Sequence, residues 1–188
     1  MEIRETSLQG LKIVAPRKFV DDRGVFWETW RQGMMSDDQG QPLVFVQDNL
    51  SVSAQGVLRG LHFQRPPHAQ GKLVRAASGS IFDVVVDLRA DSPTRGQWHG
   101  CELSVSNGLQ LWVPSGFAHG FLALEDQSVV EYRCTAMYSP ESEGSIRWDD
   151  PDIGIDWSQS GMEFPSSGPV LSGKDATAPL LRDIAMPF

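Results

Sequence analysis

His62 stands in a short run of small and apolar residues, Gly60-Leu-His62-Phe, within a segment that has the composition of a β-strand. An imidazole has an ordinary pKa near 6.5, so it can take up or release a proton at neutral pH. The other histidines are His68, His99 and His119. His68 and His99 lie among residues typical of loops, where we expect hydrogen-bonded histidines without a chemical role. His62 is therefore the first candidate for acid–base chemistry.

The segment from Pro114 to His119 predicts a turn that delivers His119 to the start of a strand. In β-barrels of the cupin type, the spacing P-x-G-x-x-H often supplies one metal ligand. A metal site also needs two further histidines close together on a strand, and a carboxylate. Here Gln64 follows His62 at the position where the second histidine would stand. This deficit argues against a metal, although a metal-dependent cupin oxygenase that uses His62, His119 and an acid stays open as an alternative.

Several cations occupy positions that a purely structural role explains poorly. Lys and Arg are costly within strands unless they are paired. A pocket for a nucleotide sugar would need fixed cations for the diphosphate, an aromatic shelf, and an acid and a base beside the reacting carbon. The cations that lie within or beside predicted strands are Arg23, Arg59, Lys72 and Arg75.

Two further groups allow both a structural and a functional interpretation. Gln47, Asp48 and Asn49 interrupt an apolar run, which a turn explains about as well as a binding site does. Tyr132 alternates with Val130 along a predicted strand and would share the interior with it. Taken alone, that position is explained most simply by a core tyrosine that hydrogen-bonds its hydroxyl group.

The elements that must position these residues are predicted to be short β-strands bounded by Gly, Pro, Asn, Asp or Ser. Their regular spacing, without crossover helices, indicates an antiparallel sandwich or barrel. Within residues 81–88, apolar residues alternate with Asp83 and Asp87, which predicts a half-buried strand. One short helix is expected over residues 29–38, and an irregular tail from Pro151 onward is expected to wrap over the barrel. The predicted strands are Leu43–Val46, Val57–Phe63, Lys72–Ala77, Ile81–Leu88, Cys101–Val105, Leu109–Val113, Gly120–Leu124 and Val129–Cys134.

Composition and charge restrict the class of protein. A chain of 188 residues, 40% hydrophobic and 21% charged, suits one globular domain, and we expect residues 1–188 to form it. The net charge of −8 disfavours a nucleic acid as partner. The two cysteines, Cys101 and Cys134, provide no disulfide framework. The charged start and the lack of a long apolar stretch predict neither a signal peptide nor a membrane span, so we expect a cytoplasmic location.

Together, the segments that carry the candidate residues form a specific pattern. They include Asp21-Asp-Arg-Gly24, Gly56-Val-Leu-Arg-Gly-Leu-His62-Phe-Gln64, Gln70-Gly-Lys72-Leu-Val-Arg75, Pro114-Ser-Gly-Phe-Ala-His-Gly-Phe121, Glu131-Tyr132 and Leu171-Ser-Gly-Lys-Asp175. Across nearly the whole chain this pattern resembles the dTDP-4-dehydrorhamnose 3,5-epimerase family, and the R-G-L-H and Q-G-K-L-V-R segments are its most specific part. The resemblance implies an all-β fold, a cupin-type antiparallel jelly-roll barrel. It also implies a homodimer, no metal and no other cofactor.

The resemblance further implies a reaction and a role for each residue. Such an enzyme converts dTDP-4-dehydro-6-deoxy-D-glucose to dTDP-4-dehydro-L-rhamnose, in dTDP-L-rhamnose or related deoxysugar synthesis. His62 would be the general base and Tyr132 the general acid. Asp175 would orient His62, and Lys72 would lie beside the C4 oxygen. Tyr138 matches the position that stacks on the thymine. The other residues that match substrate-binding positions are Arg23, Glu28, Gln47, Asn49, Arg59, His119, Glu143 and Lys174.

The implied chemistry explains these residue types. Protons at C3 and C5 of a 4-keto sugar lie α to the carbonyl, so a base on one face of the ring and an acid on the other can invert each centre. A 3-only epimerase of a dTDP-4-keto-deoxysugar would differ in how the acid is placed, and it stays open as an alternative. A sugar-binding cupin without activity is disfavoured, because His62, Lys72 and Tyr132 would then have no role.

Overall fold

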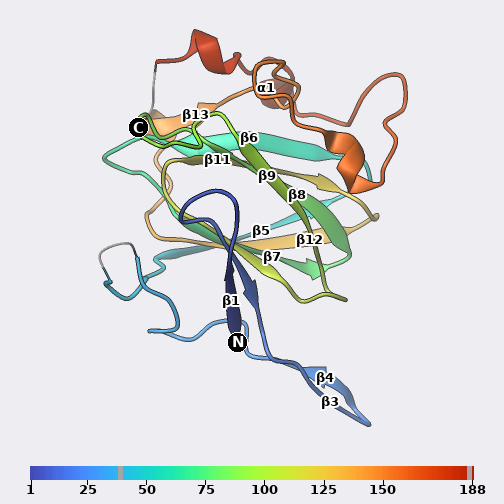
Figure 1. Cartoon of the computed structure of the whole chain (residues 1–188). Coiled ribbons are helices and arrows are strands. Elements are labelled where there is room, and N and C mark those ends of the chain that lie inside the picture. The colour runs from blue at the N-terminus through green and yellow to red at the C-terminus, as the bar shows by residue number, and fades with distance from the viewer. Residues whose placement is uncertain (38–39, 186–187) are drawn as a thin grey trace.

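Two antiparallel β-sheets face each other in the computed structural model, which describes residues 1–37, 40–185 and 188 (Figure 1). The first sheet has six strands, in the order β1 (Glu2–Glu5), β2 (Lys12–Ala15), β10 (Gln110–Val113), β7 (Lys72–Ser78), β12 (Ser128–Cys134) and β5 (Gln47–Ser53). The second has five, in the order β13 (Glu143–Ser145), β6 (Leu58–Gln64), β11 (Phe117–Ala123), β8 (Ser80–Asp87) and β9 (Trp98–Ser104). A separate hairpin, β3 (Phe19–Asp21) and β4 (Gly24–Phe26), projects from this body. The predicted all-β antiparallel architecture is confirmed.

The main core lies between the two sheets. Strand alternation directs Val74 and Val130 of the six-stranded sheet, and Val85 and Phe121 of the five-stranded sheet, into one buried cluster. Burying a side chain of this kind contributes roughly 1.5–3 kcal/mol to stability. Tyr132 packs against the same cluster, so its predicted orientation into the interior alongside Val130 is confirmed.

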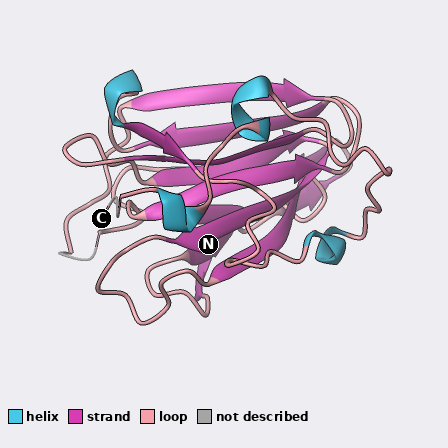
Figure 2. Ribbon diagram, turned by 90° about the horizontal axis from the view of Figure 1, so that it is seen from above, coloured by secondary structure: helices cyan, strands magenta, loops and turns pink. Residues whose placement is uncertain are grey.

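A second core covers the outer face of the five-stranded sheet. The C-terminal segment lies across this face (orange to red in Figure 1), where Ile153 and Trp157 pack against Phe82 and Val84. The predicted irregular tail is confirmed, because its described residues form short helical turns (cyan in Figure 2), an isolated bridge at Val170 and irregular chain. The helical elements are η1 (Pro140–Ser142), η2 (Trp157–Ser160), α1 (Gly173–Ala176) and η3 (Leu181–Asp183). None of the helices in the described part of the chain has the length and apolar character that crossing a bilayer requires.

Because both faces of the five-stranded sheet are covered, the prediction of a half-buried strand over 81–88 is wrong. Every residue of β8 is buried. Asp83 and Asp87 have no exposed surface and instead take polar partners inside the protein. The alternation of apolar and acidic residues in β8 therefore marks buried ion pairs, since a buried carboxylate must be paired.

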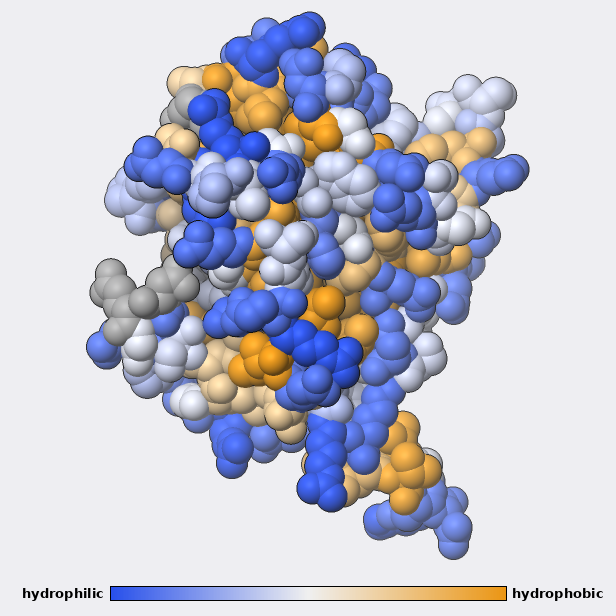
Figure 3. Space-filling model, viewed as in Figure 1, coloured by the Kyte–Doolittle hydropathy of each residue, from blue (hydrophilic) through white to orange (hydrophobic). Residues whose placement is uncertain are grey.

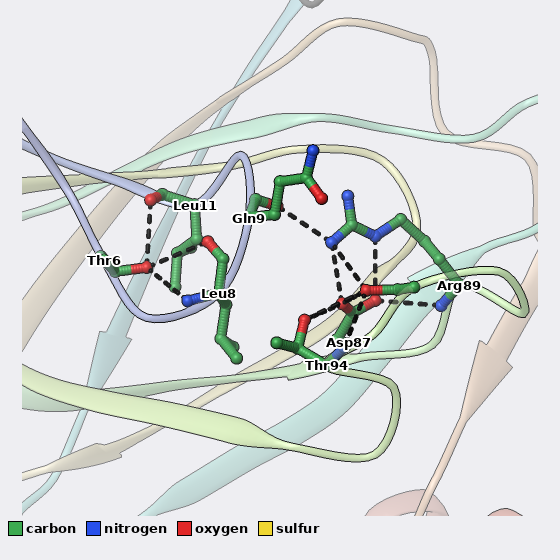
Figure 4. A network of polar contacts seen from close by, with 8 residues as sticks. Thr6, Leu8, Gln9, Leu11, Asp87, Arg89 and Thr94 are labelled. Carbon is green, nitrogen blue, oxygen red and sulfur yellow. Dashed lines mark hydrogen bonds and ion pairs between the residues drawn. The ribbon is translucent and has the colours of Figure 1, made fainter.

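Asp87 is the centre of a polar network at the end of β8 (Figure 4). Its carboxylate accepts hydrogen bonds from Arg89 Nε at 2.9 Å, Ser92 Oγ at 2.5 Å and Thr94 Oγ1 at 2.7 Å. Arg89 also donates to the carbonyl of Gln9 at 2.9 Å, which ties this turn to the N-terminal segment. Burial by itself raises the pKa of Asp87, but the hydrogen bonds from Arg89, Ser92 and Thr94 outweigh it and lower the pKa to about 2.

Because of this network, we expect the stability of the fold to depend on pH in the acidic range. A carboxyl group whose pKa is lower in the folded state stabilises the fold above its ordinary pKa of 3.8, and it loses that contribution as the pH falls towards about 2. The shift corresponds to about 2 kcal/mol. Urea unfolding should show Asp87→Asn less stable than the wild type by about 3 kcal/mol at pH 7, with the difference shrinking below about pH 4. Glu2→Gln, which breaks an exposed pair with Arg4, should leave the stability close to that of the wild type. A difference for Asp87→Asn that is as large at pH 3 as at pH 7 would contradict this account.

A loop covers the part of the outer face of the six-stranded sheet that β2, β7 and β10 form. Phe45 packs edge-on against Trp30 and Trp112, with ring centroids 4.7 and 6.0 Å away. The strand predicted for Leu43–Val46 is therefore wrong: this apolar run covers a sheet, and the strand begins at Gln47. A strand and a covering loop both need apolar residues, so composition did not separate them.

The predicted helix over 29–38 is also wrong. Residues 29–37 form turns and extended chain, and Asp38 lies outside the described residues. Gly33 adopts a φ of 80°, which a right-handed helix does not contain. Met35 is buried against the sheet together with Leu43, and the backbone N–H of Leu43 donates to the carbonyl of Met35 at 2.9 Å.

The remaining predicted strands are confirmed with shifts of a few residues at their ends. His99 lies in β9, so its predicted place in a loop is wrong. The sequence did not indicate β1 to β4 or β13. All residues of β1, β3 and β4 are exposed, so these strands carry no buried face and no hydrophobic periodicity.

Candidate active site

A cavity of about 450 Å³ lies between the two sheets and is closed on one side by the C-terminal tail. A smaller cavity of about 280 Å³ adjoins it, and the two share His62, Lys72 and Tyr132. The five-stranded sheet contributes His62, and the six-stranded sheet contributes Lys72 and Tyr132. The imidazole and the phenol therefore line the cavity from opposite walls. The tail also lines the larger cavity, with Val170, Leu171, Ser172, Lys174 and Asp175.

His62 is paired with a buried carboxylate. Its Nε2 lies 2.6 Å from Oδ1 of Asp175, which is 113 residues away in the sequence. Asp175 lies in α1, which begins after Ser172, and Ser172 Oγ donates to the other carboxylate oxygen at 2.9 Å. Burial alone raises the pKa of Asp175, but hydrogen bonds from His62, Ser172 and the Gly60 N–H hold it below its ordinary value. An ionised Asp175 accepts a hydrogen bond from Nε2–H, so Nδ1 of His62 keeps its lone pair.

The opposite wall holds a partly buried cation beside a phenol. Lys72 Nζ lies 5.9 Å from the centre of the Tyr132 ring. Burial lowers the pKa of Lys72 and raises the pKa of Tyr132, because each group loses water that would stabilise its charged form. Tyr132 therefore keeps its proton at neutral pH and can donate it.

Gln47, Asp48 and Asn49 belong to β5, so of the two interpretations the structure excludes the turn. Alternation points Gln47 and Asn49 inward, while Asp48 is exposed. Gln47 Nε2 donates to Asn49 Oδ1 at 2.9 Å, and Asn49 Nδ2 lies 3.6 Å from the sulfur of Cys134. Two polar side chains thus line the smaller cavity next to Tyr132.

His119 forms a second histidine–carboxylate pair. It lies opposite His62 across the β6–β11 pairing, and its Nε2 is 2.8 Å from Oδ2 of Asp83 on β8. Both residues are buried. Gly60 and Gly120 let β6 and β11 approach closely, because a Cβ added to Gly60 would lie 2.6 Å from the Gly120 Cα. The two histidines are therefore held side by side by strand pairing.

Three charged or polar side chains meet at the mouth of the cavities. Glu143 Oε1 lies 2.5 Å from Lys174 Nζ, and Glu143 Oε2 accepts a hydrogen bond from Tyr138 at 3.2 Å. Tyr138 remains 52% exposed. Arg59 also lines the larger cavity and donates to Ser53 Oγ at 3.0 Å. Arg75 does not belong to the site: it pairs with Glu131 on the opposite face of the sheet from Lys72.

Comparison with known proteins now decides the family. A family model described as dTDP-4-dehydrorhamnose 3,5-epimerase matches residues 5–183. The chain belongs to the dTDP-4-dehydrorhamnose 3,5-epimerase family. It is an isomerase, and its reaction is a 3,5-epimerisation.

Relatives of known sequence or structure match this chain over almost their full length. The dTDP-4-dehydrorhamnose 3,5-epimerase of Salmonella typhimurium is 50% identical over 181 residues, which cover 96% of each chain. The crystal structure of the enzyme from Elizabethkingia anophelis has a TM-score of 0.89 at 44% identity and covers 97% of each chain. That of dTDP-6-deoxy-D-glucose-3,5-epimerase from Legionella pneumophila, in complex with dTDP-4-keto-L-rhamnose, has a TM-score of 0.88 at 45% identity and covers 98% of this chain and 94% of that one. These structures confirm the predicted cupin-type barrel.

Two residues that the family resemblance predicts as substrate-binding lie away from the cavities. The side chain of Arg23 is 89% exposed on the β3–β4 hairpin and pairs with Asp21 at 2.6 Å. Glu28 pairs with Arg31 at 3.6 Å. The hairpin also exposes four apolar side chains, which form an orange patch on the projecting arm in Figure 3. They are Phe19, Val20, Val25 and Phe26.

The epimerase fold brings together no group of three His, Cys, Asp or Glu side chains that could hold a metal ion, among residues 1–37, 40–185 and 188. Gln64, which stands at the position of a second histidine ligand, donates both its amide hydrogens to backbone carbonyls. The Nε2 atoms of His62 and His119 are each occupied by a carboxylate.

Asp83 and Ser172 are site residues that the sequence did not reveal. Asp83 was assigned to an exposed face, although a carboxylate inside the apolar run 81–88 is itself a sign of a buried partner. Ser172 precedes Asp175 with the spacing of a helix N-cap, and its hydroxyl accepts the Asp175 N–H at 3.1 Å. That spacing was readable, but nothing local connected it to His62.

Proposed function

We propose that this enzyme epimerises dTDP-4-dehydro-6-deoxy-D-glucose at C3 and C5 to dTDP-4-dehydro-L-rhamnose, in dTDP-L-rhamnose or related deoxysugar synthesis. The single observation that carries the proposal is the placement of His62 and Tyr132 on opposite walls of one cavity. Inversion through an enolate needs a base on one face of the sugar ring and an acid on the other, and this cavity offers that arrangement. The names of the relatives supply the substrate.

The proton moves from carbon to His62 and a second proton arrives from Tyr132. Nδ1 of His62 takes the proton from C3, and the C–H electron pair moves through C4 to the ketone oxygen. Asp175 stabilises the imidazolium that forms, because its carboxylate accepts Nε2–H. Tyr132 then gives its proton to the opposite face of C3, and the carbonyl reforms. His62 releases its proton to solvent and Tyr132 regains one, after which C5 reacts in the same way.

Lys72 stabilises the enolate. The carbonyl oxygen of C4 gains negative charge as the proton leaves, and a cation held in a water-poor cavity lowers the energy of that state by a few kcal/mol. The ammonium group of Lys72 shares the cavity with His62 and Tyr132, which supports this role. This scheme assigns every proton transfer to side chains of the chain and uses no redox cofactor.

The remaining residues bind the nucleotide. Arg59 and Lys174 provide positive charge for the diphosphate, and His119 lines the sugar end of the cavity. Gln47, Asn49 and Glu143 line the smaller cavity, where Tyr138 stacks on the thymine. A fixed cation and an aromatic face are the groups that a nucleoside diphosphate requires.

The enzyme acts as a homodimer, with residues 1–188 as one epimerase domain in the cytoplasm. Arg23 and Glu28 lie away from the cavity of their own chain, and a second copy would supply them. The exposed Phe19 and Phe26 on the same hairpin would gain burial in such an assembly, which supports the dimer.

The proposed function is tested by incubating the wild-type enzyme with dTDP-4-dehydro-6-deoxy-D-glucose in D₂O. Deuterium should enter at both C3 and C5, and the product should be dTDP-4-dehydro-L-rhamnose, as judged by NMR. Deuterium at C3 alone would show a 3-only epimerase. No deuterium at either carbon would contradict an epimerase and leave a binding protein.

Activity should fall at alkaline pH because Lys72 loses its proton there. The ammonium form stabilises the enolate, and burial lowers its pKa below the ordinary 10.5 despite nearby Asp83 and Glu143. kcat/KM should therefore decrease as the pH rises through that lowered pKa, since the proton is then lost from the free enzyme. Lys72→Arg, which keeps its charge, should react more slowly but lose this alkaline decrease. The same decrease in Lys72→Arg would assign it to another group. Tyr132 is not a candidate for that group, because burial raises its pKa above the ordinary value.

A further inference from the structure

Gln64 is a buried amide that the proposed reaction does not use. It lies on β6 in the same strand as His62 and is only 5% exposed. Its Nε2 donates to the carbonyls of His68 at 2.7 Å and Met137 at 3.2 Å. Its Oε1 accepts the backbone N–H of Ser139 at 2.8 Å. One side chain thus holds three backbone groups of two separate loops.

Two of these three hydrogen bonds flank Tyr138. The Met137 carbonyl and the Ser139 N–H lie on either side of it in the chain, and both are bound by Gln64. The N–H of Tyr138 itself donates to Gln47 Oε1 at 2.8 Å. Gln64 comes from the five-stranded sheet and Gln47 from the six-stranded sheet, so the backbone around Tyr138 is fixed to both walls of the cavity.

We propose that Gln64 is a positioning residue for Tyr138 and sets the affinity for the nucleotide, while leaving the rate of proton transfer unchanged. The inference rests on the proposed function, because that function places thymine on the Tyr138 ring. Tyr138 is half exposed, and its hydroxyl donates a hydrogen bond to Glu143 at 3.2 Å. A ring whose backbone is already in the bound position costs less ordering entropy on binding than a ring on a free loop. Gln64 supplies that order, because a buried amide that lost these partners would be left unsatisfied.

The test compares two buried glutamines that support backbone groups. Gln64→Met keeps the length and volume of the side chain and removes its hydrogen bonds. Gln110→Met is the matched control, because Gln110 is 2% exposed and donates to the carbonyl of Thr29 at 2.8 Å, outside both cavities. Calorimetry measures the Kd of each variant for dTDP and for inorganic pyrophosphate, which has no base. Steady-state assays measure KM and kcat with the 4-keto sugar nucleotide.

Gln64→Met should raise the Kd for dTDP and the KM about tenfold, with kcat and the Kd for pyrophosphate within about twofold of wild type. Gln110→Met should leave all four values near wild type. In a Tyr138→Ala background, Gln64→Met should have no further effect on the Kd for dTDP, because the two changes act on one contact. A general loss of folded enzyme would lower kcat instead and leave KM unchanged. Comparing KM with kcat therefore distinguishes positioning from simple destabilisation.

Three results would overturn the inference: an unchanged Kd for dTDP, an equal loss for dTDP and pyrophosphate, or a loss that adds fully to that of Tyr138→Ala. Failure of the proposed function looks different, because wild-type enzyme would then exchange no deuterium, whatever its Kd for dTDP. A further measurement needs no variant. Hydrogen exchange of wild-type enzyme should show the Ser139 amide protected without nucleotide, since Gln64 accepts it. Rapid exchange there would refute the inference even if Gln64→Met did not fold.

Discussion

His62→Ala is expected to abolish the entry of solvent deuterium at C3 and C5, with a loss in kcat of roughly 10²- to 10⁴-fold. The imidazole is the group that removes the proton in the proposed reaction. Its ring is oriented by a 2.6 Å contact with Asp175. Deuterium exchange followed by NMR reports the proton removal directly, whereas product formation also depends on the later steps.

His68→Ala is the matched control for this prediction. His68 also holds one hydrogen bond through its ring, from Nδ1 to Ser142 Oγ at 2.9 Å, but it does not line the larger cavity. Its replacement should leave deuterium exchange within about twofold of wild type. Exchange that persists in His62→Ala but disappears in His119→Ala would show that the second histidine–carboxylate pair, with Asp83, provides the base.

Tyr132→Phe is expected to separate proton removal from inversion. Without the phenol, His62 can still take the C3 proton, exchange it with solvent and return deuterium to the same face of the ring. Deuterium should therefore enter C3 more slowly than in the wild type and with retained configuration, while formation of the inverted product falls roughly 10²- to 10⁴-fold. NMR of the recovered sugar nucleotide distinguishes the two outcomes.

The packing of Tyr132 makes this substitution a mild one for the fold. Phenylalanine keeps the ring that packs on the main core and lies 5.9 Å from Lys72 Nζ. The unfolding temperature and the Kd for dTDP should stay close to wild-type values, and both serve as controls. Inversion at the wild-type rate in Tyr132→Phe would remove Tyr132 as the acid and leave its hydroxyl group a structural role.

The strands could be predicted because each one carries its own pattern. In β12 the alternation of Val130 and Tyr132 with Glu131 follows from burial of one face, and this pattern is complete within a few residues. Local sequence also singled out His62 as an acid–base candidate and Lys72 as a cation that a structural role explains poorly. The interior position of Tyr132 was predicted as well, but taken alone it indicated a core tyrosine, and its role as the acid came from the family resemblance.

The covering segments could not be predicted in the same way. Leu43–Val46 is apolar because it packs over a sheet, and β8 is buried on both faces because the tail covers it. In both cases the decisive partner is remote in the chain, so no local periodicity records it. The partner of His62 is the strongest example: Asp175 was assigned through the family resemblance, and its pairing spans 113 residues.

By itself, the sequence determined the all-β fold, the strands that hold His62, Lys72 and Tyr132, and, through its resemblance to a known family, the class of reaction. These properties depend on residue types and on spacings of a few positions, which the chain displays directly. Only the tertiary structure decided that Asp83 pairs with His119, that Gln64 holds the Tyr138 loop, and that Arg23 lies away from the cavity of its own chain. Hydrogen bonds and burial between distant segments depend on how the sheets and the tail come together in space, and local spacing does not identify which distant residues meet.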